Sequence, residues 1–312
     1  MKNKYLFVLL LLLAMSLLGY GFVWRYKGQE QQEREGVTIV TSFYPMQIAA
    51  MNVVGDCQGV TVECLSEPQT GCLHDYQLTP QDMILLSHAD VFLVNGGGIE
   101  GFLTEVAKEY PGLVILDAGE DVFSGEAHSD SEDASGEAHH HGENAHAWMS
   151  ISHYKQQIES ICQGLSQADP AHREVYRQNA DAYLVKIREV EKLAGEVREQ
   201  AAGTPVVIFH EAYEYLAEDL GMPVEGLLNL DEERQVSAGE TADIIGTIQE
   251  HGIRMLLAEE LYGKDMGRTV EAETGCRVYN LDTLVRGEVT ADAWLIGMRE
   301  NLRILQEALC AK

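Results

Sequence analysis

The sequence predicts an α/β protein with two lobes, each a parallel β-sheet flanked by helices, joined by one long rigid helix. Short apolar runs alternate with helical stretches in both halves of the chain, which is the pattern of βαβ units in a parallel sheet. Between the halves, one helical pattern continues from residue 169 to residue 200, long enough to span a small domain. With 312 residues, the chain has the length of two ordinary domains.

The first lobe is expected to comprise residues 37–168. Thr79 and Pro80 mark a helix start, because threonine is a favourable N-cap and proline fits the first helical position. The run Gly96-Gly97-Gly98 follows a predicted strand but lacks the rest of a phosphate-binding loop, so we interpret it as a turn. The strands predicted from apolar runs are 37–41, 60–65, 91–95 and 113–117, and the helices are 45–54, 99–107 and one that starts after Thr79.

The linking helix, residues 169–200, is predicted from apolar residues that recur at helical spacing between Val175 and Leu193. Residues 201–312 should then form the second lobe. There Gly221 and Gly252 follow two helical stretches, as glycines after helix C-termini do. The strands expected in this lobe are 206–209, 254–258 and 277–281, and the helices are 211–220, 238–251, 265–274 and 291–310.

The N-terminus carries an export or anchoring signal. Lys2 and Lys4 precede an apolar run, residues 5–24, which basic residues follow. A run of about 20 apolar residues is also long enough to span a bilayer. Residues 1–28 are therefore predicted to be a signal peptide or an uncleaved membrane anchor, and the polar residues 29–36 a short tether. In both cases the rest of the chain lies outside the cytoplasm, at the cell surface or in the periplasm.

The formal net charge of -28 bears on the partners of the chain. Nucleic-acid binding needs clustered Lys and Arg, so we expect no nucleic-acid partner. A negative surface instead raises the local concentration of cations. Residues 120–143 are rich in carboxylates, contain four histidines and have few apolar residues. We interpret them as a mobile surface loop, either a solvated linker or a collector of metal.

Six cysteines in an exported chain permit disulfide bonds. None has the C-x-x-C spacing of a thiolate zinc site, so structural bridges are the expected use of these residues. We prefer Cys276 and Cys310 as a pair, because both come late in the second lobe.

Three histidines lie where predicted elements end. His74 precedes the helix start at Thr79, His146 stands between the acidic stretch and a helix, and His210 follows the strand 206–209. Ligands of open α/β sheets collect beyond the carboxyl ends of the strands. Neutral imidazole is the commonest protein ligand for zinc, and three imidazoles with one oxygen complete a tetrahedral shell. The histidines are far apart in sequence, so their spacing alone does not predict a site.

Around these histidines the sequence resembles the zinc- and manganese-specific solute-binding proteins of ABC transporters. Leu73-His74-Asp75-Tyr76 is similar to the first ligand motif of that family, and His146-Ala147-Trp148 to the second. Phe209-His210-Glu211-Ala212 is similar to the third, and Leu281-Asp282-Thr283-Leu284 to the fourth, where an aspartate completes the site. The likeness runs in order over nearly all of residues 37–312.

The resemblance implies one metal site between the lobes and no catalytic or cofactor-binding residue. The implied ligands are His74, His146, His210 and Asp282. The fourth ligand stays open between Asp282, Glu259, Glu260 and a water molecule. Manganese members of the family carry glutamate where this chain has His210, and imidazole suits zinc better than manganese. The implied cargo is therefore Zn²⁺, with Mn²⁺ as the alternative.

The implied function is capture of zinc by a monomer and its delivery to an ABC permease in the membrane. A shell closed by protein ligands leaves no position for a reactive water, so we expect no enzyme activity. A zinc hydrolase of the H-E-x-x-H type would need a histidine where the chain has Glu214. A surface adhesin or zinc buffer on the same scaffold is the remaining alternative.

Overall fold

A computed structural model describes residues 36–70, 73, 76–124, 144–228, 236–259 and 264–310. Residues Thr38–Lys312 form one compact unit, and Met1–Val37 form another, of which only Gly36 and Val37 are described. The predicted leader, nearly all of the tether and most of the acidic stretch therefore lie outside the described residues. Within the described part of the chain, no helix is long and apolar enough to cross a membrane.

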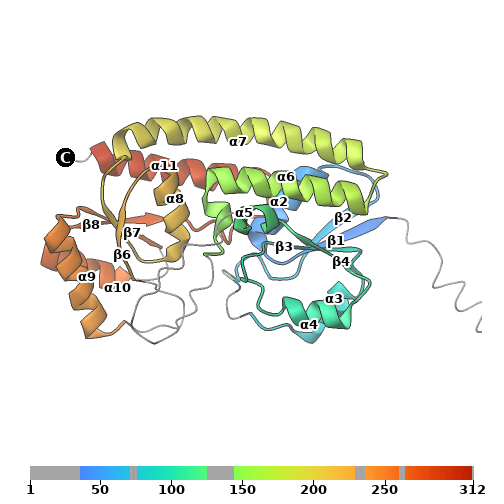
Figure 1. Ribbon diagram of the computed structural model, residues 1–312, viewed down its shortest axis with the longest axis horizontal. Coiled ribbons are helices and arrows are strands. Elements are labelled where there is room, and N and C mark those ends of the chain that lie inside the picture. Colours follow the sequence, from blue (N-terminus) through green and yellow to red (C-terminus); the bar gives the residue numbers. More distant parts are fainter. Residues whose placement is uncertain are drawn as a thin grey trace, which may run out of the picture. The chain divides into compact units, whose positions relative to one another are not determined.

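The strands of the larger unit fall into two groups, one in each half of the chain (Figure 1). The first group consists of β1 (Val37–Thr41), β2 (Val60–Cys64), β3 (Val91–Val94) and β4 (Val114–Asp117). The second group consists of β5 (Val206–Ile208), β6 (Val224–Leu227), β7 (Met255–Glu259) and β8 (Arg277–Leu281).

Each group forms a four-stranded sheet, and the two sheets have the same topology. The spatial order is β2-β1-β3-β4 in the first and β6-β5-β7-β8 in the second. The pairs of β1 with β3, β3 with β4, and β5 with β6 and β7 are parallel, as is the pair of β7 with β8. The predicted fold class is thus confirmed, and the two halves share a structural repeat that their sequences do not reveal.

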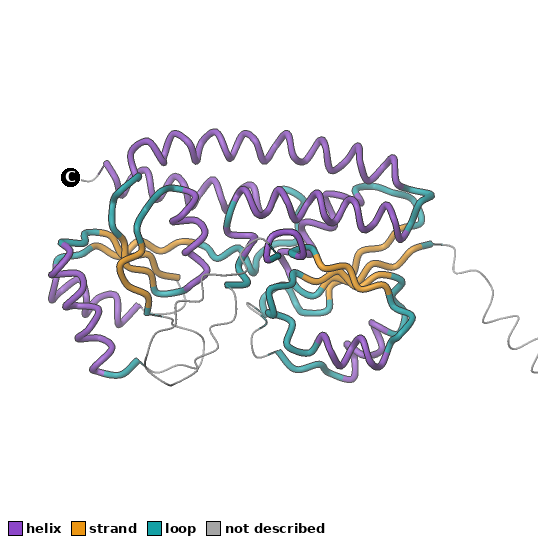
Figure 2. Tube along the Cα trace, viewed as in Figure 1, coloured by secondary structure: helices purple, strands orange, loops and turns teal. Residues whose placement is uncertain are grey.

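Helices cover these sheets, and the tube in Figure 2 shows them around the orange strands. In the first half they are α2 (Tyr44–Val54), α3 (Pro80–Leu86), α4 (Leu103–Glu109), α5 (Glu120–Phe123) and α6 (Ile151–Ala168). They continue with α7 (Arg173–Ala201), α8 (Glu214–Asp219), α9 (Ala238–His251), α10 (Lys264–Thr274) and α11 (Ala293–Cys310). Two short 3₁₀ helices, η1 (Ala147–Met149) and η2 (Glu211–Tyr213), precede α6 and α8. Thr79 caps α3 in a capping box, as expected from its position before Pro80.

The linking helix of the prediction is α7. It packs against α2 and α6, which belong to the first half, and against α11 of the second half. It begins at Arg173 rather than at residue 169, because Asp169 belongs to a turn after α6. The Asp169 carboxylate accepts hydrogen bonds of 2.6 Å from the Tyr176 hydroxyl and 2.6 Å from Nδ1 of His172, which ties that turn to the first part of α7.

Two elements differ from the prediction. The helix α5 occupies the beginning of the stretch predicted as a loop, because Val122 and Phe123 are buried against Ala147 and so pull these residues onto the protein. The strand β6 was not predicted. It is a short edge strand whose residues alternate between half-buried and exposed, and it includes Gly226, so it lacks the apolar run that marks the central strands.

The predicted disulfide bond between Cys276 and Cys310 is wrong. Both residues carry free thiols, as do Cys57, Cys64 and Cys162. Cys276 is buried in the apolar cluster beside α9, α10 and β7, whereas Cys310 is exposed at the end of α11 and has its Sγ 4.0 Å from Oε1 of Gln200. The nearness of the two residues in chain order therefore does not bring their side chains together.

Candidate metal site

The side chain of His146 is held in one orientation by Asn144. His146 is fully buried just before η1, and both its backbone N–H and its ring Nδ1 lie within hydrogen-bond distance of Asn144 Oδ1, at 3.1 and 2.9 Å. A backbone N–H can only donate, so the atom it meets is the amide oxygen, and Nδ1 must then donate as well. The lone pair of the ring is therefore on Nε2, which is the nitrogen that could coordinate a metal.

His210 follows β5 and precedes η2, at the carboxyl edge of the second sheet. The residue is only 8 % exposed. Its Nδ1 is buried and makes no hydrogen bond within the described part of the chain. Oε2 of Glu259 lies 3.5 Å from this Nδ1, at the end of the neighbouring strand β7.

These two histidines meet although they come from different halves of the chain. Their ring centroids are 4.9 Å apart, and the ring planes are inclined by 80°. The centroid of the Trp148 ring lies 5.0 Å from the centroid of the His146 ring, and the corresponding distance between Tyr213 and His210 is 6.3 Å. Two buried imidazoles between aromatic rings can bind a metal ion of intermediate softness through nitrogen.

The carboxylates of Glu211 and Glu259 lie beside the two histidines, and that of Asp282 lies in the loop after β8. Oε1 of Glu211 lies 3.9 Å from Nδ1 of His146, and Glu259 lies beside His210 as described above. Asp282 is exposed, and its Oδ1 accepts a 2.8 Å hydrogen bond from the backbone of Leu284. Partial desolvation raises the pKa of Asp282, the hydrogen bond from the Leu284 backbone opposes this shift, and the negative charge of Glu259 adds to it. Thr283, the residue after Asp282, donates a hydrogen bond to Oε1 of Glu259, so Asp282 lies in the same region of the second half as Glu259.

The remaining predicted ligands lie outside the described residues. His74 and Glu260 are among them, so the structure does not test them. Leu73, next to His74, is fully buried, and the Tyr76 hydroxyl donates a 3.0 Å hydrogen bond to Asp82 in α3. In the described residues, no group of three or more His, Cys, Asp or Glu side chains is arranged to hold a metal.

The segments that carry the candidate ligands are bonded to one another across the two halves. The Trp148 indole N–H donates to the carbonyl of Thr283 at 2.8 Å, and the Trp294 indole N–H donates to the carbonyl of Trp148 at 2.8 Å. Nδ2 of Asn144 donates to Oε2 of Glu214 at 2.8 Å. The halves are therefore held together next to the histidines by buried hydrogen bonds, which are costly to leave unmade.

Sequence reasoning missed the residues that orient the histidines. Asn144 stands two residues before His146, and Asn in such a position commonly bonds the backbone two residues on. That local signal could have identified it. Thr283 and Arg286 surround Glu259, but only the fold brings their loop to β7, so no local pattern points to them.

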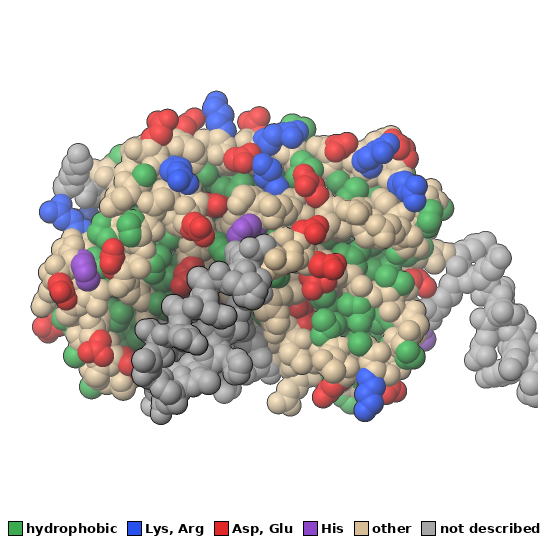
Figure 3. All heavy atoms as spheres, viewed as in Figure 1, with side chains coloured by type: hydrophobic (Ala, Val, Ile, Leu, Met, Phe, Trp, Pro, Cys, Tyr) green, Lys and Arg blue, Asp and Glu red, His purple; other side chains and the backbone are tan. Residues whose placement is uncertain are grey.

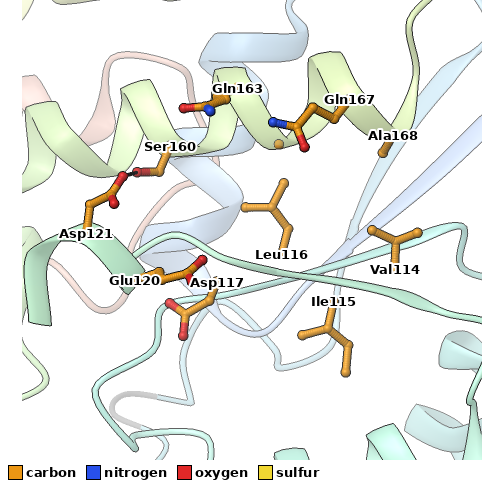
Figure 4. A pocket seen from close by; sticks show the side chains of 11 residues that line it. Val114, Ile115, Leu116, Asp117, Glu120, Asp121, Ser160, Gln163, Gln167 and Ala168 are labelled. Carbon is orange, nitrogen blue, oxygen red and sulfur yellow. Dashed lines mark hydrogen bonds between the residues drawn. The ribbon is translucent and has the colours of Figure 1, made fainter. Parts of the chain in front are cut away.

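A separate cavity of about 520 Å³ lies between β4, α5 and α6 (Figure 4). Asp117, Glu120 and Asp121 line it, with Ser160 opposite. Two of these carboxylates already accept hydrogen bonds, Asp117 from the backbone of Gly119 and Asp121 from the Ser160 hydroxyl. None of the predicted metal ligands lines the cavity. On the face seen in Figure 3, carboxylates are scattered over the surface, in keeping with the net charge.

Comparisons with known proteins agree on one family. Residues 39–308 match the protein family described as zinc-uptake complex component A, periplasmic. The iron-binding protein YfeA of Yersinia pestis is 31 % identical over 253 residues, which is 77 % of this chain and 74 % of that protein. The high-affinity zinc uptake system protein ZnuA of Bacillus subtilis is 25 % identical over 295 residues, 92 % of each chain.

Solved structures share the fold. The solute-binding protein FpvC of Pseudomonas aeruginosa, in complex with Ni²⁺, superimposes with a TM-score of 0.74 at 23 % identity, over 88 % of this chain and 97 % of that chain.

Proposed function

Because the chain belongs to the zinc-uptake complex component A family, we propose that it captures Zn²⁺ outside the cytoplasm and delivers it to an ABC permease. Members of the family are substrate-binding transport proteins and not enzymes. The observation that carries the proposal is the pair of buried imidazoles, His146 and His210, contributed by the two halves with centroids 4.9 Å apart.

In the proposed site, His146 binds the cargo through Nε2, because Asn144 occupies its Nδ1. His210 supplies the second imidazole and His74 the third. Asp282 is the proposed fourth ligand, since its Oδ1 is bonded to the backbone of Leu284 and its Oδ2 is the atom left to bind. Three imidazoles and one carboxylate form the tetrahedral donor set that zinc accepts readily.

The identity of the metal rests on ligand type. Neutral imidazole favours zinc, whereas manganese prefers sites richer in oxygen. One relative is named for iron and another for zinc, so the family name does not decide the cargo. We propose zinc because histidine stands at position 210.

Binding of the metal should also favour one relative arrangement of the two halves. The proposed ligands come from both, and α7 packs against helices of each. A permease that recognises both halves could then distinguish the loaded from the empty protein, because only loaded protein has the metal joining them. The movement should be small, since hydrogen bonds such as Trp148 to Thr283 already join the halves next to the site.

The proposal is tested by metal content and competitive titration of the purified chain from residue 29 onward. We expect tight binding of a single Zn²⁺ and weaker binding of Mn²⁺ and Fe²⁺. Binding that is weak, multiple and equal for all three metals would contradict it. Deleting the gene in the source organism should impair growth only when zinc is limiting. Impaired surface attachment with normal growth would favour an adhesin instead.

A further inference from the structure

The carboxylate of Glu259 is buried and is already occupied on one side. Glu259 ends β7 and is 6 % exposed. Its Oε1 accepts a 2.6 Å hydrogen bond from the Arg286 guanidinium and a 3.2 Å hydrogen bond from the Thr283 hydroxyl. A carboxylate that is removed from water needs such partners, and here Arg286 supplies the compensating charge.

The other oxygen of Glu259 faces His210. Oε2 lies 3.5 Å from Nδ1 of His210, and that nitrogen is buried without a hydrogen bond within the described residues. A neutral imidazole must carry its proton on one of its two nitrogens, and a buried N–H without an acceptor is unfavourable. The two residues extend from paired neighbouring strands, β5 and β7, so the backbone holds the carboxylate beside the ring.

We propose that Glu259 is a positioning residue for the metal site, which deepens the function proposed above and rests on it. Glu259 accepts the Nδ1–H of His210 as a hydrogen bond, which keeps the lone pair of the ring on Nε2 and fixes the ring orientation. Carboxylates that accept the second N–H of a ligating histidine also make the ring a stronger donor. With Oε1 bonded to Arg286 and Thr283 and Oε2 directed at Nδ1, Glu259 is not a ligand itself.

The two histidines are thus supported differently. Asn144 accepts the Nδ1–H of His146 with a neutral amide oxygen, whereas Glu259 offers His210 a charged oxygen. Thr283 also links Glu259 to the segment that contains His146. Its hydroxyl donates to Glu259, and its carbonyl accepts the indole N–H of Trp148, two residues after His146. The position of Glu259 therefore depends on the segment that holds His146.

The test uses the chain from residue 29 onward with the variant Glu259→Gln. Its matched control is Glu191→Gln, which removes a carboxylate paired with Lys155 on the surface. We expect Glu259→Gln to weaken zinc binding roughly 10- to 100-fold, as loss of such partners generally does. The number of nitrogen and oxygen ligands seen by X-ray absorption should not change. The control should bind zinc like the parent.

A second readout separates positioning from general stability. Imidazole ¹⁵N and ¹H signals of the zinc-loaded protein should show Nδ1 of His210 protonated in the parent, with its proton signal shifted upfield in Glu259→Gln. The signals of His146 should stay in place. If Glu259→Gln does not fold, Glu259→Asp, which keeps the charge but shortens the side chain, should give a smaller upfield shift and an intermediate affinity.

Three results would overturn the proposal. They are an unchanged affinity, unchanged His210 signals, and the loss of one oxygen ligand in Glu259→Gln, which would make Glu259 a ligand. Failure of the proposed function looks different, because the parent itself would then not bind zinc tightly. In that case the His210 signals of the metal-free parent and variant still decide whether Glu259 accepts the Nδ1–H.

Discussion

The rings of His146 and His210 lie edge to face, with centroids 4.9 Å apart and planes inclined by 80°. One ring stands before η1 in the first half of the chain, and the other follows β5 in the second half. The fold therefore brings together two potential nitrogen ligands that are distant in the sequence.

Replacing Asn144 by alanine should weaken zinc binding roughly 10- to 100-fold, because the proposed ligand ring of His146 loses the partner that orients it. Asn144 Oδ1 accepts from both the backbone and the ring of His146, so without it the ring can change tautomer and orientation. Competitive zinc titration measures the effect. Gln178→Ala, which removes an exposed amide on α7, serves as the control. Equal affinities of Asn144→Ala and the control would refute the role of Asn144.

The buried carboxylate of Glu100 should make stability depend on pH. Burial raises the pKa of Glu100 to about 7, although hydrogen bonds from the backbone of Asn95, the Ser42 hydroxyl and the backbone of Gly96 oppose this shift. Between the ordinary pKa of 4.5 and about 7, the folded state binds more protons than the unfolded state. The contribution of Glu100 to the free energy of unfolding therefore falls as pH rises through this range, by on the order of 3 kcal/mol in total.

Urea unfolding between pH 4.5 and 8 tests this expectation. The parent should lose more stability with rising pH than Glu100→Gln, whose side chain does not titrate. Glu191→Gln should follow the parent. Parallel profiles for the parent and Glu100→Gln would show that Glu100 is ionised normally in the folded protein.

The free thiols should differ in reactivity. Cys310 is exposed, whereas burial raises the pKa of Cys276 to about 11 and so disfavours the reactive thiolate. A thiol reagent followed by peptide mass spectrometry should label Cys310 quickly and Cys276 only after unfolding. Protection of both residues in the native protein, released by a reductant, would instead indicate the disulfide bond that the structure does not contain.

Trp294→Phe should destabilise the chain by about 1–3 kcal/mol, the usual cost of leaving a buried acceptor without a partner. The Trp294 indole N–H donates to the carbonyl of Trp148, and its ring stacks on Tyr154 with centroids 4.1 Å apart. Phenylalanine keeps an aromatic ring but removes the donor. Chemical denaturation measures the change, with Ile296→Ala, an exposed position on the same helix, as the control. A variant as stable as this control would argue against a structural role for the bond.

The fold was largely predictable because its central strands are apolar runs and its helices have clear ends. All four residues of β3 are buried, as befits a strand covered on both faces, and Thr79 with Pro80 marked the start of α3. The edge strand β6 lacks such a run, and α5 depends on contacts of Val122 and Phe123 with Ala147, which sequence does not reveal. The predicted disulfide bond between Cys276 and Cys310 was wrong for the same reason, because position in the sequence does not determine which side chains lie together in the fold.

The candidate site was predictable in part. Resemblance to a family picked out His146 and His210, and the structure places their rings together. The groups that orient these rings depend on geometry. Glu259 was considered only as a possible ligand, and the hydrogen bonds of Thr283 and Arg286 that direct it toward His210 exist only in the folded chain.

The most direct test of the account is zinc titration of the chain from residue 29 onward, with and without His210→Ala. We predict that the parent binds a single zinc ion tightly, and that the variant keeps its fold but loses most of this affinity. A variant that binds zinc as tightly as the parent would contradict the central claim, because the buried pair of imidazoles would then not be the site of capture.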